Sequence, residues 1–217
     1  MATPRGIDLR TFTHIDILQP QTAGFLGTVA QGYPPLEGDA ALFVEVSPGM
    51  DINRVTDVVL KATSCTPGMQ IVERRYGALE LHHRDQGQVR AAGEAIQREL
   101  GFTVQDRLKP KIMSEQIIRG VTGHHSLLVN RFRHGNLLRE TTSLYVLEVH
   151  PAGYALLATN EAEKAAQIDV LEFISFGAFG RVYLGGGEAE IDEAAKAAIN
   201  ALRAVTGREN NSSETTG

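Results

Sequence analysis

The sequence predicts an α/β chain built from two copies of one small domain, each with helices packed on a sheet. Strand-like and helix-like patterns alternate with short connections, and their order restarts after residue 106. The second half also resembles the first at a constant spacing. Gly77 and Gly180 lie 103 positions apart, as do Pro48 and Pro151. One spacing kept without a gap over about 70 residues indicates an internal duplication.

The first half predicts, in order, a strand, a helix, a strand, a helix, a pair of strands and a helix. Alternating apolar residues indicate the strands, and apolar residues three and four positions apart indicate the helices. Asp51 is a plausible N-cap, and Thr66-Pro67-Gly68 is expected to break the chain before the strand pair. The expected strands span 9–17 and 40–46, the strand pair spans 70–81, and the helices span 21–31, 52–63 and 89–100.

The second half predicts the same order of elements. A short, charged, proline-bearing segment at 106–111 is expected to be the linker, so that the first domain covers 1–106 and the second 107–207. The polar residues 208–217 are expected to form a disordered tail. The expected strands span 112–121 and 143–149, the strand pair 171–182, and the helices 124–132, 155–166 and 188–205.

Composition argues against several classes of partner. The net charge of −5 gives no basic excess for binding nucleic acid or an acidic membrane surface. No stretch approaches the roughly 18 apolar residues of a membrane span. Cys65 is the only cysteine, so no internal disulfide can form and a reducing cytoplasm is the expected setting. A small buried hydrophobe is the expected role of this residue.

The sequence shows no catalytic or metal-binding constellation. His82 and His83 lie on an expected strand, where neighbouring side chains point to opposite faces, and His124 and His125 diverge by about 100° on an expected helix. No serine or cysteine lies in a recognisable nucleophile elbow. The GxxG pattern at 177–180 is a weak signal for an RNA clamp, because strands are expected on both sides of it. We therefore predict no enzyme, no cofactor and no metal.

Two equivalent turns differ in chemistry. Glu73-Arg74 places an acid beside a base in the first half, whereas the equivalent turn in the second half carries aromatic residues and glycine. The ordinary reading is a solvated charged turn. Around a threefold axis, however, alternating acids and bases from neighbouring chains would neutralise each other and close a central opening. Because exposed ion pairs contribute only about 0–1 kcal/mol, such a closure would open at little cost.

Five segments carry a resemblance to a known family. They are VERRYG at 72–77, SPGMDINRVTDVVLKAT at 47–63, NEAEKAA at 160–166, FGAFGR at 176–181 and LGGGEAEIDEAAKAA at 184–198. With these segments the chain resembles the circularly permuted, tandem-domain (BMC-T) shell proteins of bacterial microcompartments, among them the carboxysome shell trimers. The resemblance covers nearly all of residues 8–207. It implies two permuted BMC domains with mainly antiparallel sheets.

The resemblance also implies an assembly and its functional residues. Three chains would form a pseudohexameric tile with a gated central pore, and two such trimers can stack face to face. Tiles would join other shell proteins, both hexamers and pentamers, around encapsulated enzymes. The implied residues are Glu73 and Arg74 as the pore gate, Arg75, Tyr76, Gly77, Phe176, Gly177, Ala178, Phe179 and Gly180 as the pore lining, and Lys61 and Lys164 as tile-edge contacts.

The sequence says less about which metabolite passes the pore and which microcompartment contains the protein. Arg75 adds a second base to the charged turn, so an open pore would favour small anionic metabolites. The expected location is a microcompartment shell in the cytoplasm, and the type of microcompartment stays open. For either lysine, an ordinary charge on a helix surface is the alternative. For the whole chain, the alternative function is an oligomeric pair of sensor domains that binds a small molecule at an oligomer interface.

Overall fold

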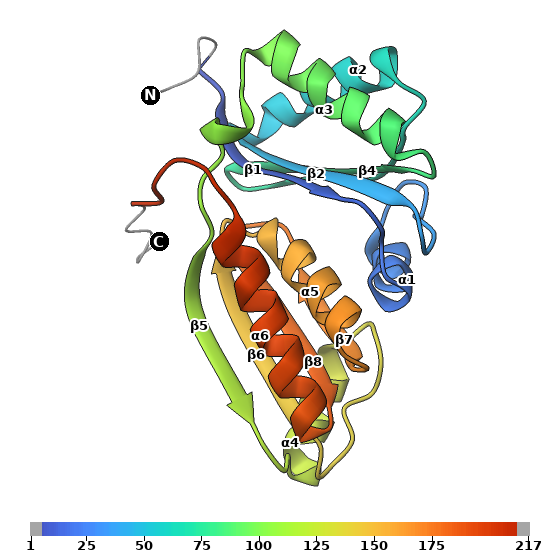
Figure 1. Ribbon diagram of the computed structural model, residues 1–217, viewed down its shortest axis with the longest axis vertical. Helices are drawn as coiled ribbons and strands as arrows, with labels where there is room; N and C mark the ends of the chain where they lie inside the picture. The colour runs from blue at the N-terminus through green and yellow to red at the C-terminus, as the bar shows by residue number, and fades with distance from the viewer. Residues whose placement is uncertain (1–5, 212–217) are drawn as a thin grey trace.

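The computed structural model describes residues 6–211 and consists of two α/β domains, drawn one above the other in Figure 1. Each domain contains a four-stranded antiparallel sheet with helices on one face, which confirms the predicted fold class. The strand order is β1-β2-β4-β3 in the first sheet and β5-β6-β8-β7 in the second. The two orders are the same once each strand is matched to its counterpart.

The elements follow the predicted sequence of strands and helices in both halves. In the first domain they are β1 (Asp8–Ile15), α1 (Pro20–Val29), β2 (Ala40–Ser47), α2 (Ile52–Ala62), β3 (Thr66–Glu73), β4 (Tyr76–His83) and α3 (Gln86–Leu100), with short 3-10 turns at Gly49–Asp51 and Val104–Asp106. In the second they are β5 (Lys111–Ile118), α4 (Gly123–Phe132), β6 (Ser143–His150), α5 (Tyr154–Ala165), β7 (Asp169–Ile174), β8 (Gly180–Gly186) and α6 (Glu188–Ala204).

Equivalent residues make equivalent backbone contacts. The amide of Gly32 donates to the carbonyl of Gly68 at 2.9 Å, and the amide of Gly135 donates to that of Leu171 at the same distance. The ladder between β1 and β2 is irregular at Leu9/Thr11, and the ladder between β5 and β6 is irregular at the equivalent Ile112/Ser114. The duplication seen in the sequence is therefore a duplication of backbone geometry.

One expectation about β3 is wrong. Residues 66–68 were expected to break the chain, but β3 begins at Thr66 and contains Pro67. This strand lies at the edge of its sheet, where a proline without an N–H leaves no partner unpaired. The ladder to β4 is irregular between Pro67 and Met69, as a proline in an edge strand often requires.

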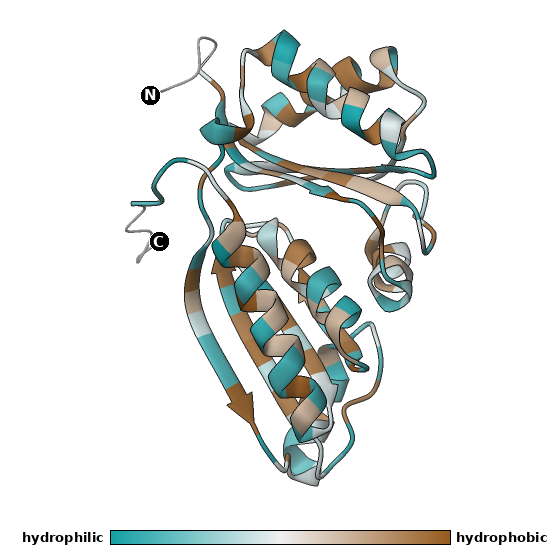
Figure 2. Cartoon of the chain, in the orientation of Figure 1, coloured by the Kyte–Doolittle hydropathy of each residue, from teal (hydrophilic) through white to brown (hydrophobic). Residues whose placement is uncertain are grey.

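The two domains are joined by a shared core. Helix α1 does not cover its own sheet but packs against α5 and β7 of the second domain. The face of the first sheet that α2 and α3 leave open packs on α5, so that Phe43 and Ala41 share a hydrophobic cluster with Tyr154 and Ala155. Figure 2 shows how hydrophobic residues alternate with hydrophilic ones along α6 and the strands behind it.

The end of the described chain returns to the first domain. Residues from 208 onward were expected to be disordered, yet Arg208 forms a parallel bridge with Leu108 and an ion pair with Asp8. Asn210 donates from its side chain to the carbonyl of Lys109 at 3.0 Å. The order thus extends at least through Asn210, and residues 212–217 of the expected tail lie outside the described residues.

Candidate functional site

The first of the two turns is a tight hairpin between β3 and β4. Glu73 pairs with Tyr76, so that Arg74 and Arg75 alone form the connection. Arg74 has a φ of 52°, in the left-handed region that two-residue hairpins require and that non-glycine residues rarely adopt. Backbone strain of this kind persists at functional sites when the surrounding structure holds it in place.

The acid and base of this turn contact each other only loosely. The Nε of Arg74 lies 3.7 Å from an Oε of Glu73, and the two side chains are 83 % and 48 % exposed. At this distance and exposure an ion pair contributes little, because water screens both charges. The two side chains are therefore free to separate at low cost.

The root of the same turn is held firmly. Tyr76 is buried, and the guanidinium of Arg10 lies 3.5 Å from the centre of its ring. The Nε of Arg10 donates to Glu45 at 2.8 Å, and both of these side chains are buried. A cation stacked on an aromatic ring and fixed by a buried carboxylate gives the turn a rigid base beneath its exposed tip.

The second turn, residues 175–179 between β7 and β8, lies directly against the first. Gly177 has a φ of 92°, and a Cβ built on it would lie 3.4 Å from the Cγ of Glu73. The ring of Phe179 lies 5.8 Å from that of His150, whose Nε2 is 3.0 Å from an Nη of Arg10. Arg10 therefore supports both turns, one through Tyr76 and the other through His150.

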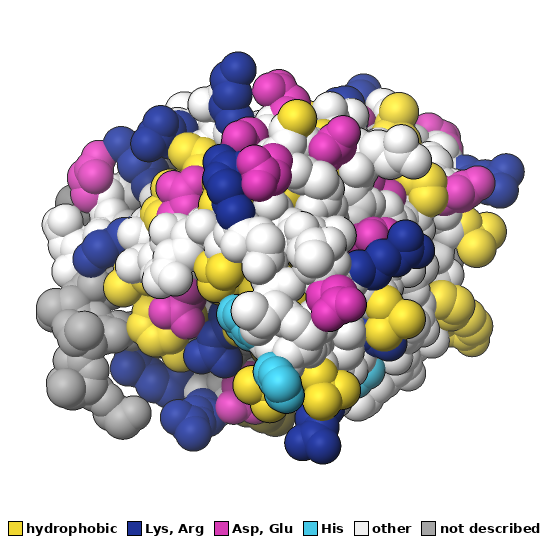
Figure 3. Space-filling model, turned by 90° about the horizontal axis from the view of Figure 1, so that it is seen from below, with side chains coloured by type: hydrophobic (Ala, Val, Ile, Leu, Met, Phe, Trp, Pro, Cys, Tyr) yellow, Lys and Arg dark blue, Asp and Glu magenta, His cyan; other side chains and the backbone are white. Residues whose placement is uncertain are grey.

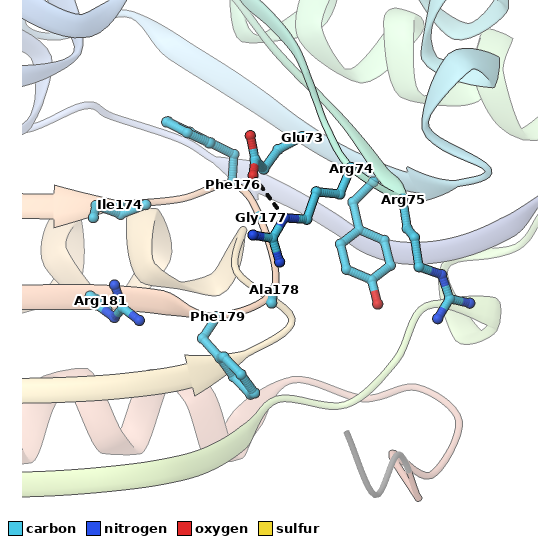
Figure 4. Close-up of a pocket in the computed structure, with 10 residues that line it drawn as sticks. Glu73, Arg74, Arg75, Ile174, Phe176, Gly177, Ala178, Phe179 and Arg181 are labelled. Carbon is cyan, nitrogen blue, oxygen red and sulfur yellow. Dashed lines mark ion pairs between the residues drawn. The ribbon is translucent and has the colours of Figure 1, made fainter. Parts of the chain in front are cut away.

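Together the two turns line a hollow of about 680 Å³. Figure 4 shows Glu73 and Arg74 of the first hairpin beside Gly177 and Ala178 of the second, with the side chain of Arg75 extending away from the second hairpin. The sequence did not single out two residues of the hollow, Ile174 and Arg181, which flank the second turn on β7 and β8. Its lining residues are Glu73, Arg74, Arg75, Tyr76, Ile174, Phe176, Gly177, Ala178, Phe179 and Arg181.

Two of the expected lining residues lie behind the turns instead. A Cβ at Gly77 would lie 2.1 Å from the carbonyl oxygen of Gly49, and one at Gly180 would lie 2.3 Å from that of Ala152. Neither glycine lines the hollow. Without a Cβ, each glycine lets its strand lie close to the backbone just before a helix, which is α2 for Gly77 and α5 for Gly180. This role is structural.

The hollow carries a positive balance. Its lining contains three arginines, Arg74, Arg75 and Arg181, and one acid, Glu73, while Arg181 donates from Nε to Glu148 at 3.0 Å. Cations on converging side chains raise the local concentration of small anions. No three His, Cys, Asp or Glu side chains within residues 6–211 are grouped so as to hold a metal ion.

The two lysines lie away from this hollow, in the last turns of equivalent helices. Lys61 on α2 pairs with Asp57 at 2.7 Å, and Lys164 on α5 lies 3.8 Å from Glu161. Both lysine side chains are largely exposed and keep their ammonium groups at the surface. Over the described part of the chain, no helix has the length and apolar character needed to cross a membrane.

Comparisons with known proteins agree with this geometry. The protein-family model described as the CsoS1D N-terminal domain matches residues 9–106. The carboxysome shell protein CcmP of Synechococcus elongatus is 50 % identical over 204 residues, which are 94 % of this chain and 96 % of that protein. The carboxysome shell protein CsoS1D of Prochlorococcus marinus is 44 % identical over 92 % of this chain and 78 % of its own. These relatives are named as shell proteins, which does not favour the sensor alternative.

Solved structures place the whole two-domain chain in the same family. A fused permuted hexameric shell protein, MSM0275 of the RMM microcompartment, superposes with a TM-score of 0.90 at 46 % identity over 93 % of this chain and 99 % of its own. The double-ringed trimeric shell protein MSM0271 gives a TM-score of 0.91 at 38 % identity over 94 % and 100 %. The chain belongs to the tandem-domain bacterial microcompartment shell proteins, the family that includes CcmP and CsoS1D.

Proposed function

We propose that this protein, a structural component of a microcompartment shell, assembles as a homotrimer around a central metabolite pore. The observation that carries the proposal is the hollow that both turns line, where a Cβ on Gly177 would lie 3.4 Å from the Cγ of Glu73. A threefold axis through this region would bring together three copies of each turn. Six domains would then surround one opening; a similar solved structure is described as a trimeric shell protein.

Glu73 and Arg74 are the gate of this pore. Their contact of 3.7 Å within one chain is weak, so either side chain can turn to a neighbouring chain and form a shorter, charge-assisted bond. The closed state would then consist of alternating acids and bases around the axis. The rigid base under Tyr76 keeps the backbone of the turn in place while the side chains rotate.

Small anionic metabolites are the class of molecule that the open pore would admit. The lining contains more arginines than acids, and a positive rim attracts carboxylates and phosphates. Arg75 lies beside the gate and remains in the lining when Glu73 and Arg74 separate. The hydrophobic Phe176 and Phe179 narrow the passage without binding the anion.

For assembly beyond the trimer, the proposal uses the descriptions of similar proteins. One similar structure is described as a double-ringed trimer, and we propose that two trimers of this protein stack face to face in the same way. The exposed Lys61 and Lys164 would contact neighbouring tiles, among them hexamers and pentamers of other shell proteins. The compartment lies in the cytoplasm, where the buried free thiol of Cys65 stays reduced.

Glu73→Ala combined with Arg74→Ala tests the gate. We expect the trimer to persist, since both side chains are exposed, while electron cryomicroscopy shows open pores alone. Arg84→Ala, an exposed charge on the first domain away from the hollow, is the control and should retain closed pores. A double variant that still populated closed and open pores would remove the gate from the proposal.

Lys61→Ala tests the tile edge. We expect it to weaken the formation of sheets, seen by negative-stain electron microscopy, and to leave the trimer mass unchanged. Lys196→Ala is a matched control, because Lys196 is similarly exposed and also pairs with an acid on its own helix, α6. Equal sheet formation by Lys61→Ala and wild type would contradict the edge role.

A further inference from the structure

A buried histidine lies close to the support of both turns. Figure 3 views the end of the molecule at which α4 lies in Figure 1 and shows histidine side chains at the surface. His150, the last residue of β6, differs from these because it is 1 % exposed. The equivalent residue of the first domain, 103 positions earlier, is Ser47. At this position, therefore, the second domain alone carries an imidazole.

One nitrogen of this imidazole faces the first domain. The Nε2 of His150 lies 3.0 Å from an Nη of Arg10. Arg10 is itself held by the carboxylate of Glu45 and by its stacking on the ring of Tyr76. The imidazole ring also lies 5.8 Å, centre to centre, from the ring of Phe179, a residue of the second turn that lines the hollow. His150 thus connects the buried arginine of the first domain with the second turn.

The other nitrogen faces the C-terminal segment, residues 206–210. The Nδ1 of His150 lies 3.0 Å from the side-chain amide nitrogen of Asn210. The same amide nitrogen donates to the backbone carbonyls of Lys109 and His150 at 3.0 and 3.1 Å. The segment that follows α6 therefore reaches the imidazole from the side opposite in bonding to Arg10, through the second ring nitrogen.

These two contacts compete for one lone pair. A guanidinium and a side-chain amide nitrogen only donate hydrogen bonds, and a neutral imidazole has a single accepting nitrogen. If Nε2 accepts from Arg10, the proton lies on Nδ1 and points at the amide nitrogen of Asn210. If Nδ1 accepts from Asn210, the proton lies on Nε2 and points at the guanidinium. Turning the amide over would not remove the conflict, because its oxygen would then face two carbonyl oxygens.

We propose that His150 is a positioning residue for the second turn, and that Asn210 controls it by competing with Arg10 for the imidazole. The proposal rests on the proposed function, since it concerns how one side of the pore lining is held. With the proton on Nδ1, the imidazole is fixed to Arg10, and Phe179 packs on a ring that is anchored in the first domain. With the proton on Nε2, the imidazole is fixed to Asn210 instead, and its bond to Arg10 is lost.

The two turns respond differently to this exchange. Arg10 keeps its bond to Glu45 at 2.8 Å in either form, so the first turn stays in place. The second turn loses its link to Arg10, so that Phe179 can move while the backbone of the charged gate does not. The C-terminal segment stays attached in both forms through Arg208, whose Nε donates to the carbonyl of Asp106 at 2.8 Å.

Asn210→Ala tests the competition, with Glu209→Ala as the matched control. Glu209 belongs to the same segment, and its exposed side chain pairs with Lys109. Heteronuclear NMR of protein labelled at its histidine nitrogens distinguishes the two protonation forms of His150. We expect the ratio of the Nδ1-protonated to the Nε2-protonated form to rise by about fivefold in Asn210→Ala, the factor that corresponds to one lost hydrogen bond, and to stay at its wild-type value in Glu209→Ala. An unchanged ratio in Asn210→Ala, or an equal change in the control, would overturn the competition.

His150→Gln and His150→Asn test the positioning role as a pair. The longer glutamine places its amide oxygen near the position of Nε2 and can still accept from Arg10, whereas the shorter asparagine places it near Nδ1, out of reach of Arg10. Electron cryomicroscopy of the assembled protein should show Phe179 in its wild-type position in His150→Gln and displaced in His150→Asn. The same position of Phe179 in both variants would overturn the positioning role and leave the shell function standing. An assembled wild type without a central pore would instead overturn the proposed function, while the NMR ratio would still decide the competition at His150.

Discussion

Glu45 and Glu148 occupy equivalent places in β2 and β6, yet their surroundings differ. Glu45 is buried and accepts from Arg10 at 2.8 Å, from the hydroxyl of Thr11 at 3.2 Å and from the amide of Gly153 at 3.1 Å. Glu148 is half-buried and accepts from the Nε of Arg181 at 3.0 Å. The first acid lies at the contact between the two domains, and the second lies on a sheet that the other domain does not cover within residues 6–211.

The difference shows that joining two domains in one chain buries the first of these two acids. Burial raises the pKa of Glu45, and the charge of Arg10 opposes that rise. A buried ion pair contributes little net stability, but removing one partner leaves an uncompensated charge. The buried pair at the contact between the two domains can therefore hold the backbone of both turns in place, because Arg10 also contacts Tyr76 and approaches His150.

Breaking the buried pair should give the largest effect. Arg10→Met introduces the residue found at the equivalent position 113 and leaves Glu45 buried without its cation. We expect the free energy of unfolding, measured with urea, to fall by about 3–5 kcal/mol. Arg10→Met combined with Glu45→Gln removes both charges and should cost clearly less. If the double variant were as unstable as the single one, the charge of Glu45 would not be the cause.

Equivalent substitutions in the two domains should lower the free energy of unfolding by similar amounts. Gly77→Ala and Gly180→Ala each place a Cβ within 2.1 to 2.3 Å of a backbone carbonyl oxygen. We expect each to lower the free energy of unfolding by about 2–3 kcal/mol, since backbone atoms must move. Gly24→Ala is the control, because it lies on α1 with open space around it. A large effect at one glycine alone would show that the two domains are not structurally equivalent.

Much of this comparison was visible in the sequence. Constant spacing between Gly77 and Gly180 identified the two turns, since the close backbone approach behind each turn tolerates glycine alone. Ile174 and Arg181 were missed although they directly flank the second turn. Alternation along a strand does not reveal which face meets a hollow formed with another hairpin.

Other features depend on contacts that a linear pattern does not contain. The sequences of β1 and β5 do not show that the first strand is buried and the second exposed, because the covering helix comes from the other domain. Arg10 was likewise not recognised as the support of both turns. Arg208 and Asn210 lie in a polar segment typical of disorder, yet pairing with Leu108 and Lys109 orders them.

The smallest expected effect concerns a carboxyl group that the first domain alone possesses. Glu80 on β4 is buried beside His82, with an Nδ1 to Oε1 distance of 3.2 Å, whereas the equivalent residue on β8 is Tyr183. Burial raises the pKa of Glu80, the nearby charge of Asp39 raises it further, and His82 opposes the rise. The folded chain therefore retains a proton that the unfolded chain releases above pH 4.5.

Because its folded pKa is raised, Glu80 lowers stability as the pH increases from about 4.5 through that pKa. Glu80→Gln cannot lose a proton there. We expect the variant to gain about 1 kcal/mol on wild type between pH 4 and pH 7 in urea unfolding experiments. Glu94→Gln, at an exposed site on α3, should follow the wild-type pH profile. A gain for Glu80→Gln that did not change with pH would mean that its cause is packing, and that this site does not set the two domains apart in their response to pH.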